Sequence, residues 1–183
     1  VLRQFFVNPA LIVGRLASFH FTPTELSKKN LLAEGVPSEM ITQTGNTVID
    51  ALYWVLNKIG KDKILKENIL SGLHKLLPFN WEEKKFILIT GHRRENFGEG
   101  FLQICEALSF LASHYDDWDF VYPVHMNPNV KEPVYKMLKD SSNFHLIKPL
   151  DYEPFLCLLR ACYLVLTDSG GIQEEAPSLG KPV

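Results

Sequence analysis

One polar turn in the sequence has the residue types of an anion-binding site. An apolar run ends at Thr167, and Ser169, Gly170 and Gly171 follow it after one aspartate. Glycines at such a turn let a ligand come close to the backbone, and the free N–H groups and dipole of a helix that begins there attract phosphate. Glu175 lies about one helical turn further on, where its carboxylate could accept hydrogen bonds from a ribose diol. A plain N-cap, followed by glycines that permit tight helix–strand packing, explains the turn equally well.

The turn excludes two common nucleotide-binding motifs. It has neither the Walker spacing nor the GxGxxG spacing, so the sequence supports neither P-loop chemistry nor dinucleotide binding.

A second polar segment follows the apolar run 86–90. It contains His92, Arg93 and Arg94 directly after Gly91. A histidine can donate to a phosphate or transfer a proton near neutral pH, and arginine suits bidentate phosphate contacts. The alternative is a solvated cluster of surface charges, but the position after a strand favours a functional role.

Two further side chains are weaker candidates from the residues alone. His125 follows the apolar run 119–124, and a lone histidine there is more often structural. Phe155 lies near a helix start and could stack on a base, although a core aromatic at helical spacing is the simpler interpretation. The other histidines have no polar group of residues around them, and we interpret them as structural or exposed: His20, His74, His114 and His145.

The elements that must position these residues alternate between apolar strands and amphipathic helices. This βαβα order predicts an α/β fold with a Rossmann-like, doubly wound parallel sheet, in which ligands bind outside the carboxyl ends of the strands. The predicted strands are 86–90, 119–124, 144–147 and 163–167, and the predicted helices are 99–114, 128–139, 153–160 and 171–179. The first third adds strands at 19–23 and 40–43 and helices at 25–34 and 48–59. The chemistry should then gather at Gly91-His92, Val124-His125 and Asp168-Ser169.

Composition narrows the class of protein. Hydrophobic residues make up 46% of the 183 residues, and the net charge is −2, which is typical of a soluble globular protein without a broad nucleic-acid or acidic-membrane surface. No run approaches the roughly 18 apolar residues that span a bilayer, and we interpret the apolar first fourteen residues as an internal start. The cysteines have no metal or redox spacing, so we expect buried free thiols at Cys105, Cys157 and Cys162.

Taken together, five segments in order resemble the non-hydrolysing, bacterial-type UDP-N-acetylglucosamine 2-epimerases. The resemblance covers about residues 15–183, and the matching segments are Phe19–Thr24, Gly45–Asp50, Thr90–Asn96, Pro123–Asn129 and Leu166–Val183. Five ordered motifs are far more specific than any one of them.

The resemblance implies an activity. The family has two Rossmann-like domains, as in the B-type glycosyltransferases, with the sugar nucleotide between them. It interconverts UDP-N-acetylglucosamine (UDP-GlcNAc) and UDP-N-acetylmannosamine (UDP-ManNAc) by anti elimination of UDP to a glycal and readdition with C2 inverted. The resemblance further implies that the enzyme uses neither NAD nor a metal and has no nucleic-acid or membrane partner. It also implies a homodimer in the cytoplasm, with a place in amino-sugar metabolism that feeds surface polysaccharide.

The resemblance also implies roles for single residues. His92 would be a catalytic residue beside the UDP phosphates, and Phe155 would contact the uracil. The diphosphate would be held by Ser169, Gly170 and Gly171, and the ribose by Glu175. Arg93 and His125 match a second UDP-GlcNAc site that serves some bacterial members as an activator site.

The sequence departs from the family at its start. No Asp or Glu precedes Glu25, whereas the family places catalytic acids in its first domain. We therefore expect a central piece of the enzyme, with residues 1–45 from the end of the first domain and 46–183 forming an incomplete UDP-binding domain. We expect this piece alone to be inactive. A B-type glycosyltransferase, a non-catalytic UDP-sugar-binding module and a hydrolysing relative remain alternatives.

Overall fold

The computed structural model describes residues 13–14, 16–91 and 98–183, and they divide into two compact units. The first unit ends at Ala51, and the second spans Leu52–Val183. The predicted domain boundary between residues 45 and 46 falls just before helix α3 (Thr47–Lys61), which continues from one unit into the other.

The first unit contains a parallel strand–helix–strand unit. Its elements are β1 (His20–Thr22), α2 (Glu25–Ala33), the 3-10 helix η1 (Ser38–Met40) and β2 (Ile41–Gln43). The two strands pair in parallel, as a connection through a helix allows. Thr24 caps α2, because its hydroxyl oxygen accepts the Ser27 N–H at 3.1 Å. Gly35 follows the helix with φ of 83°, a conformation that favours glycine. The order of elements expected for this region is confirmed.

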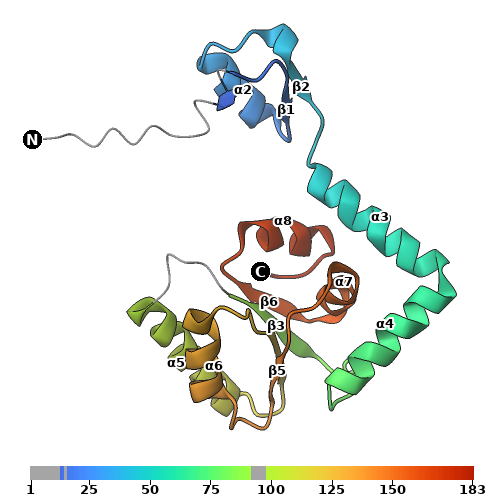
Figure 1. The fold of residues 1–183 in the computed structure, drawn as a ribbon, viewed down its shortest axis with the longest axis vertical. Helices are drawn as coiled ribbons and strands as arrows, with labels where there is room; N and C mark the ends of the chain where they lie inside the picture. Colours follow the sequence, from blue (N-terminus) through green and yellow to red (C-terminus); the bar gives the residue numbers. More distant parts are fainter. Residues whose placement is uncertain (1–12, 15, 92–97) are drawn as a thin grey trace, which may run out of the picture. The chain divides into compact units, whose positions relative to one another are not determined.

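The second unit is a four-stranded parallel sheet with helices on both faces (Figure 1). After α3, its elements are α4 (Lys63–Leu76), β3 (Phe86–Thr90), α5 (Glu99–His114), β4 (Asp119–Pro123), α6 (Pro128–Leu138), β5 (Phe144–Ile147), α7 (Tyr152–Ala161), β6 (Leu164–Thr167) and α8 (Gly170–Ser178). The strand order is β5-β4-β3-β6. The Rossmann-like α/β fold predicted from the sequence is therefore confirmed.

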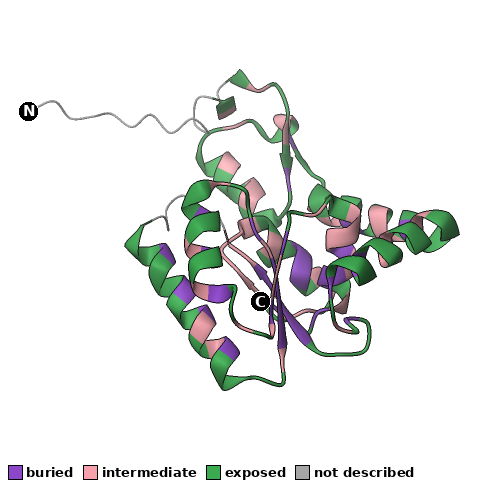
Figure 2. Ribbon diagram, turned by 60° about the horizontal axis from the view of Figure 1, so that its bottom comes forward, coloured by how far each residue is buried: buried purple, intermediate pink, exposed green. Residues whose placement is uncertain are grey.

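Alternating side chains of the strands bury two cores, one on each face of this sheet. Phe86 and Leu88 of β3 face a core that includes residues of α3, α4, α7 and α8, whereas Ile87 and Ile89 face a core built with α5 and α6. Figure 2 shows buried residues along the strands and exposed residues striping the helices. Burial on both faces explains why β3 is an uninterrupted apolar run.

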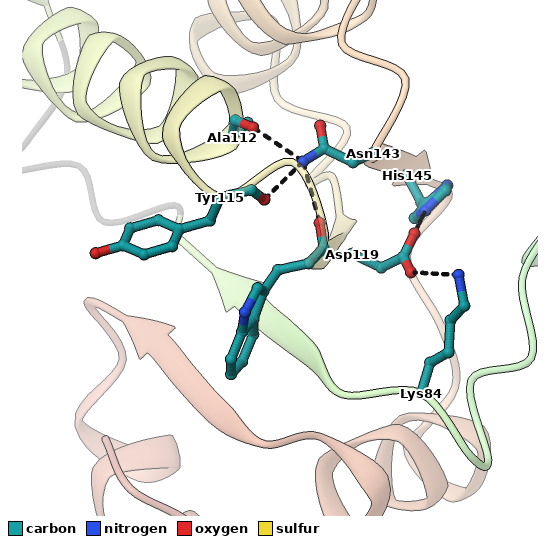
Figure 3. A network of polar contacts seen from close by, with 7 residues as sticks. Lys84, Ala112, Tyr115, Asp119, Asn143 and His145 are labelled. Atoms are coloured by element: carbon teal, nitrogen blue, oxygen red, sulfur yellow. Dashed lines mark hydrogen bonds and ion pairs between the residues drawn. The ribbon is translucent and has the colours of Figure 1, made fainter.

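A polar network fixes the amino ends of β4 and β5 (Figure 3). Asp119 Oδ1 lies 2.6 Å from His145 Nε2, and Asp119 Oδ2 lies 3.8 Å from Lys84 Nζ. The Asn143 side-chain nitrogen lies 2.9–3.2 Å from three carbonyl oxygens, those of Ala112, Tyr115 and Trp118. His145 is structural, as expected, but the expectation that it lacks polar neighbours was wrong, because its partner is 26 residues away along the chain.

Helix α4 was not predicted. Cys105 and Cys162 are buried as expected, but Cys157 is only partly buried. None of the helices in the described ranges combines the length and apolarity that crossing a membrane requires.

Candidate functional site

The candidate site lies between β3 and β6, where the order in which the chain adds strands to the sheet reverses. From β3 the chain passes through α5 to β4 on one side, whereas β6 pairs with the other side of β3. Ligands of open α/β sheets bind outside the carboxyl ends of the strands at such a switch point. The two strands end in register, with Thr90 opposite Thr167.

Two threonine hydroxyls join the strand ends to the turn that follows β6. Thr90 Oγ1 lies 2.6 Å from Thr167 Oγ1, and Thr167 Oγ1 also accepts the backbone N–H of Ser169 at 2.9 Å. The N–H of Asp168 donates to the carbonyl oxygen of Thr90 at 3.3 Å. The turn is therefore fixed to both strands, and we call Thr90 and Thr167 the threonine pair.

The turn itself is open to a ligand. Ser169 is the N-cap of α8 in an extended conformation, and its side chain caps none of the helix N–H groups in the described structure. Among the described residues, a Cβ added at Gly171 would meet Ser169 Oγ at 3.9 Å, which is ordinary van der Waals contact. Packing among the described residues therefore does not require a glycine at Gly171, and this room, together with the N–H groups that a helix start offers, favours the anion-binding interpretation of this residue.

Gly91, at the end of β3, is held by a buried tyrosine on the neighbouring strand. The Tyr122 hydroxyl donates to the carbonyl oxygen of Gly91 at 2.6 Å. Burial raises the pKa of Tyr122 well above its ordinary value, and the nearby Cys105 and Asp168 raise it further, so Tyr122 stays a protonated donor. His92 and Arg93 follow Gly91 but lie outside the described residues, so their places in the site stay predictions.

A pocket of about 310 Å³ lies between α5 and the ends of β3 and β6. Apolar side chains such as Phe101, Ile104 and Leu111 form most of its wall, and Gly91 and Asp168 also line it. An apolar wall cannot replace the water around a phosphate. An anion is therefore better placed at the turn than in this pocket.

Glu175 is buried beside the start of α7. Glu175 is only 7% exposed, and its Oε1 accepts a hydrogen bond from the Tyr152 hydroxyl at 3.0 Å. Burial raises the pKa of Glu175, the hydrogen bond from Tyr152 lowers it in part, and the neighbouring Glu174 raises it. Sequence reasoning missed Tyr152, because nothing in the local pattern indicates a partner 23 residues further along the chain.

The two remaining candidates lie on other elements. Phe155 is on α7, partly buried, and packs against the core that also includes Ile172 and Ala176 of α8. His125 is exposed after β4, and its Nδ1 accepts the backbone N–H of Asn127 at 3.1 Å. The structure thus brings Ser169, Gly171 and Glu175 onto one helix at the switch point, and it places His125 one strand away.

Residues 13–14, 16–91 and 98–183 contain no group of three or more His, Cys, Asp or Glu side chains arranged to hold a metal ion.

Comparisons with known proteins give one consistent answer. The family model described as UDP-N-acetylglucosamine 2-epimerase matches residues 11–183. A curated UDP-N-acetylglucosamine 2-epimerase of Campylobacter jejuni is 58% identical over 172 residues, which cover 94% of this chain and 45% of that protein.

Solved structures agree with the curated relative. The crystal structure of UDP-GlcNAc 2-epimerase from Neisseria meningitidis bound to UDP-GlcNAc superposes with a TM-score of 0.86 at 44% identity, covering 100% of this chain and 50% of that one. The Methanocaldococcus jannaschii UDP-GlcNAc 2-epimerase in complex with UDP-GlcNAc and UDP superposes with a TM-score of 0.75 at 30% identity, covering 92% and 45%. The chain spans about half the length of the relatives it matches.

Proposed function

This chain belongs to the UDP-N-acetylglucosamine 2-epimerase family, and from that premise we propose that the whole protein interconverts UDP-GlcNAc and UDP-ManNAc. The 183 residues supply most of the half that binds UDP. The relatives from Neisseria meningitidis and Methanocaldococcus jannaschii, whose structures contain UDP-GlcNAc or UDP, support this assignment.

The observation that carries the proposal is the open turn at the start of α8. Its N–H groups and the helix dipole suit the diphosphate, and the threonine pair holds the turn in place. Glu175 lies five residues beyond Gly170, or about 7.5 Å along the helix axis at 1.5 Å per residue. That separation is comparable to the distance between the diphosphate and the ribose hydroxyls of a nucleotide.

These residues have defined tasks in the proposed reaction. Elimination breaks the bond between C1 and the UDP oxygen while C2 loses its proton, and readdition of UDP with protonation on the other face of C2 gives the epimer. Donors at Ser169, Gly170 and Gly171 stabilise the negative charge that develops on departing UDP. Glu175 binds the ribose, and Phe155 contacts the uracil.

Further residues complete the proposal. His92 acts beside the phosphates as a catalytic residue, and Arg93 and His125 contribute to a second UDP-GlcNAc site. We propose a homodimeric, cytoplasmic enzyme that uses neither NAD nor a metal. The 183-residue chain by itself should bind UDP without converting UDP-GlcNAc.

Gly171→Ala tests the binding site directly. The added methyl group fits the protein, so the fold should be retained, but it occupies the space in which a diphosphate would approach the backbone. We expect isothermal titration to show at least a roughly tenfold loss of UDP affinity, which corresponds to about 1.4 kcal/mol. Gly72→Ala in α4 is the matched control, because it is also a helical glycine with room for a Cβ, which there meets nothing within 4 Å among the described residues. Unchanged UDP affinity in Gly171→Ala would contradict the site.

Turnover distinguishes the alternative functions. The whole protein, incubated with UDP-GlcNAc, should form UDP-ManNAc until both epimers are present at equilibrium. Steady accumulation of free UDP would indicate a hydrolysing enzyme, and transfer of the sugar to an acceptor would indicate a glycosyltransferase. UDP binding without any turnover by the whole protein would indicate a binding module.

A further inference from the structure

One contact at the candidate site involves a side chain that the family resemblance assigns no role. The hydroxyl of Tyr152, the first residue of α7, donates to Glu175 Oε1 at 3.0 Å. Tyr152 is 38% exposed, whereas Glu175 is 7% exposed. A solvent-facing side chain thus reaches over a buried carboxylate.

Resting on the proposed function, we infer that Tyr152 is a positioning residue that holds the Glu175 carboxylate by one oxygen and presents the other to the ribose. The bond thereby sets the preference for a ribose over a deoxyribose nucleotide.

The two carboxylate oxygens of Glu175 differ in their surroundings. Oε1 is occupied by the Tyr152 hydroxyl. The hydrogen bond found for this carboxylate among the described residues is the one at Oε1, so the inference places the ribose at Oε2. An ionised carboxylate accepts several hydrogen bonds, and a diol hydroxyl can therefore bind at Oε2 while Tyr152 stays in place.

Position along α7 strengthens the inference. Tyr152 and Phe155 are three residues apart, so they lie on neighbouring positions of one helix face. Phe155 packs in the same core as Ile172 and Ala176 of α8. The start of α7 therefore lies beside α8, with the proposed base contact and the proposed ribose contact joined through Tyr152.

The protonation states of the pair agree with this role. Burial raises the pKa of Tyr152 to about 12, and its contact with Glu175 contributes, so the hydroxyl remains a donor. The same hydrogen bond lowers the pKa of Glu175 against the effects of burial and of Glu174. Tyr152 thus favours the charged form of Glu175, which is the stronger acceptor for a diol.

The test compares UDP with 2′-deoxy-UDP by isothermal titration of the full chain. In wild type, UDP should bind more tightly than 2′-deoxy-UDP. Tyr152→Phe removes one hydrogen bond to a charged group without changing the ring, so UDP should lose about three- to tenfold in affinity. The affinity for 2′-deoxy-UDP should change less, and the ratio of the two affinities should fall.

Tyr53→Phe is the matched control. The Tyr53 hydroxyl donates to the carbonyl oxygen of Ser178 at 2.6 Å, so this variant also removes a tyrosine hydrogen bond to α8, but at its other end. If Tyr152 only anchored the helix, both variants would weaken both nucleotides alike. We expect the ratio to fall in Tyr152→Phe and to stay at the wild-type value in Tyr53→Phe.

Failure of the inference differs from failure of the proposed function. Absence of UDP binding by wild type would overturn the proposed function and the inference with it. UDP binding with a wild-type ratio in Tyr152→Phe, or with no preference for ribose in wild type, would overturn the inference alone.

Discussion

Thr167→Val isolates the contribution of the threonine pair. Valine keeps the branched shape and the strand preference of threonine but has no hydroxyl. The variant therefore removes the 2.6 Å contact with Thr90 Oγ1 and the acceptor for the Ser169 N–H. Packing around β6 should change little, so the measured effect reports these two hydrogen bonds.

The magnitude follows from the groups left without partners. Loss of one ordinary hydrogen bond costs about 1 kcal/mol, and a buried donor without an acceptor costs about 1–3 kcal/mol. Ser169 is only partly buried, so water can take up part of the loss at its N–H. We expect Thr167→Val to lower the free energy of unfolding by about 2 kcal/mol. Thr90→Val removes only the contact between hydroxyls and should cost about 1 kcal/mol.

Urea denaturation followed by tryptophan fluorescence measures this difference. The three tryptophans are Trp54, Trp81 and Trp118, all in the Leu52–Val183 unit, so the signal reports the unit that carries the threonine pair. Thr167→Ser keeps the hydroxyl and should recover most of the lost stability. Thr167→Val should also bind UDP more weakly, because the turn has lost its hydrogen bond to the Thr167 hydroxyl.

Two results would refute this reasoning. Thr167→Val could have the same urea midpoint as wild type. Alternatively, its loss of unfolding free energy could equal that of Thr90→Val within about 0.3 kcal/mol, which is the scatter within which such changes add at independent sites. The first result would mean that water replaces both hydrogen bonds without loss. The second would mean that the Ser169 N–H does not depend on Thr167.

Three further predictions concern protonation and backbone conformation. Because burial raises the pKa of Glu175 in the folded chain, wild type loses stability as pH rises above the ordinary pKa of 4.5. Glu175→Gln should therefore be the more stable protein at pH 7 in urea denaturation. If the variant stays more stable than wild type below pH 4.5, the raised pKa of Glu175 is not the cause. Burial also raises the pKa of Cys105 and of Cys162 to about 11, so Ellman's reagent at pH 8 should label at most the partly exposed Cys157 before denaturation and all three thiols afterwards. Rapid labelling of two thiols in the native chain would show that one of the two cores is open to the reagent. Gly180 follows the C-cap of α8 with φ of 71° and, among the described residues, open space where a Cβ would lie, so Gly180→Ala should cost about 1 kcal/mol from backbone conformation alone. An unchanged urea midpoint would argue against the left-handed conformation of Gly180.

The order of strands and helices was readable because each element depends on local residue patterns. Strand β3 is a continuous apolar run, and α5 has its buried residues on one side, so period and length identify both. Helix α4 was missed although Leu65, Ile69 and Leu73 recur at helical spacing. Only Asp62 separates α4 from α3, and a single N-cap residue is a weak sign of a new helix.

The site could be predicted only in part, for a different physical reason. Ser169 and Gly171 are neighbours in sequence, and their residue types alone indicate an anion-binding turn. The contacts that support them join distant residues: Thr90 with Thr167 across 77 positions, and Tyr152 with a carboxylate across 23. Such pairs depend on how the strands and helices are packed, which one sequence without its fold does not reveal.

The polar network at the amino end of β4 has a consequence for how this protein can change in length. Asp119 is fixed to His145 at one end of the strand, and Tyr122 is fixed to Gly91 near the other. Asp119 and Tyr122 are three residues apart in β4, or about 10 Å at roughly 3.3 Å per residue, and the strand therefore fixes the distance between two attachment points. One inserted residue would turn every later side chain to the opposite face and move the Tyr122 hydroxyl away from Gly91. Insertions and deletions should accumulate in the loops beyond the strand, while the distance from the network to the site stays constant.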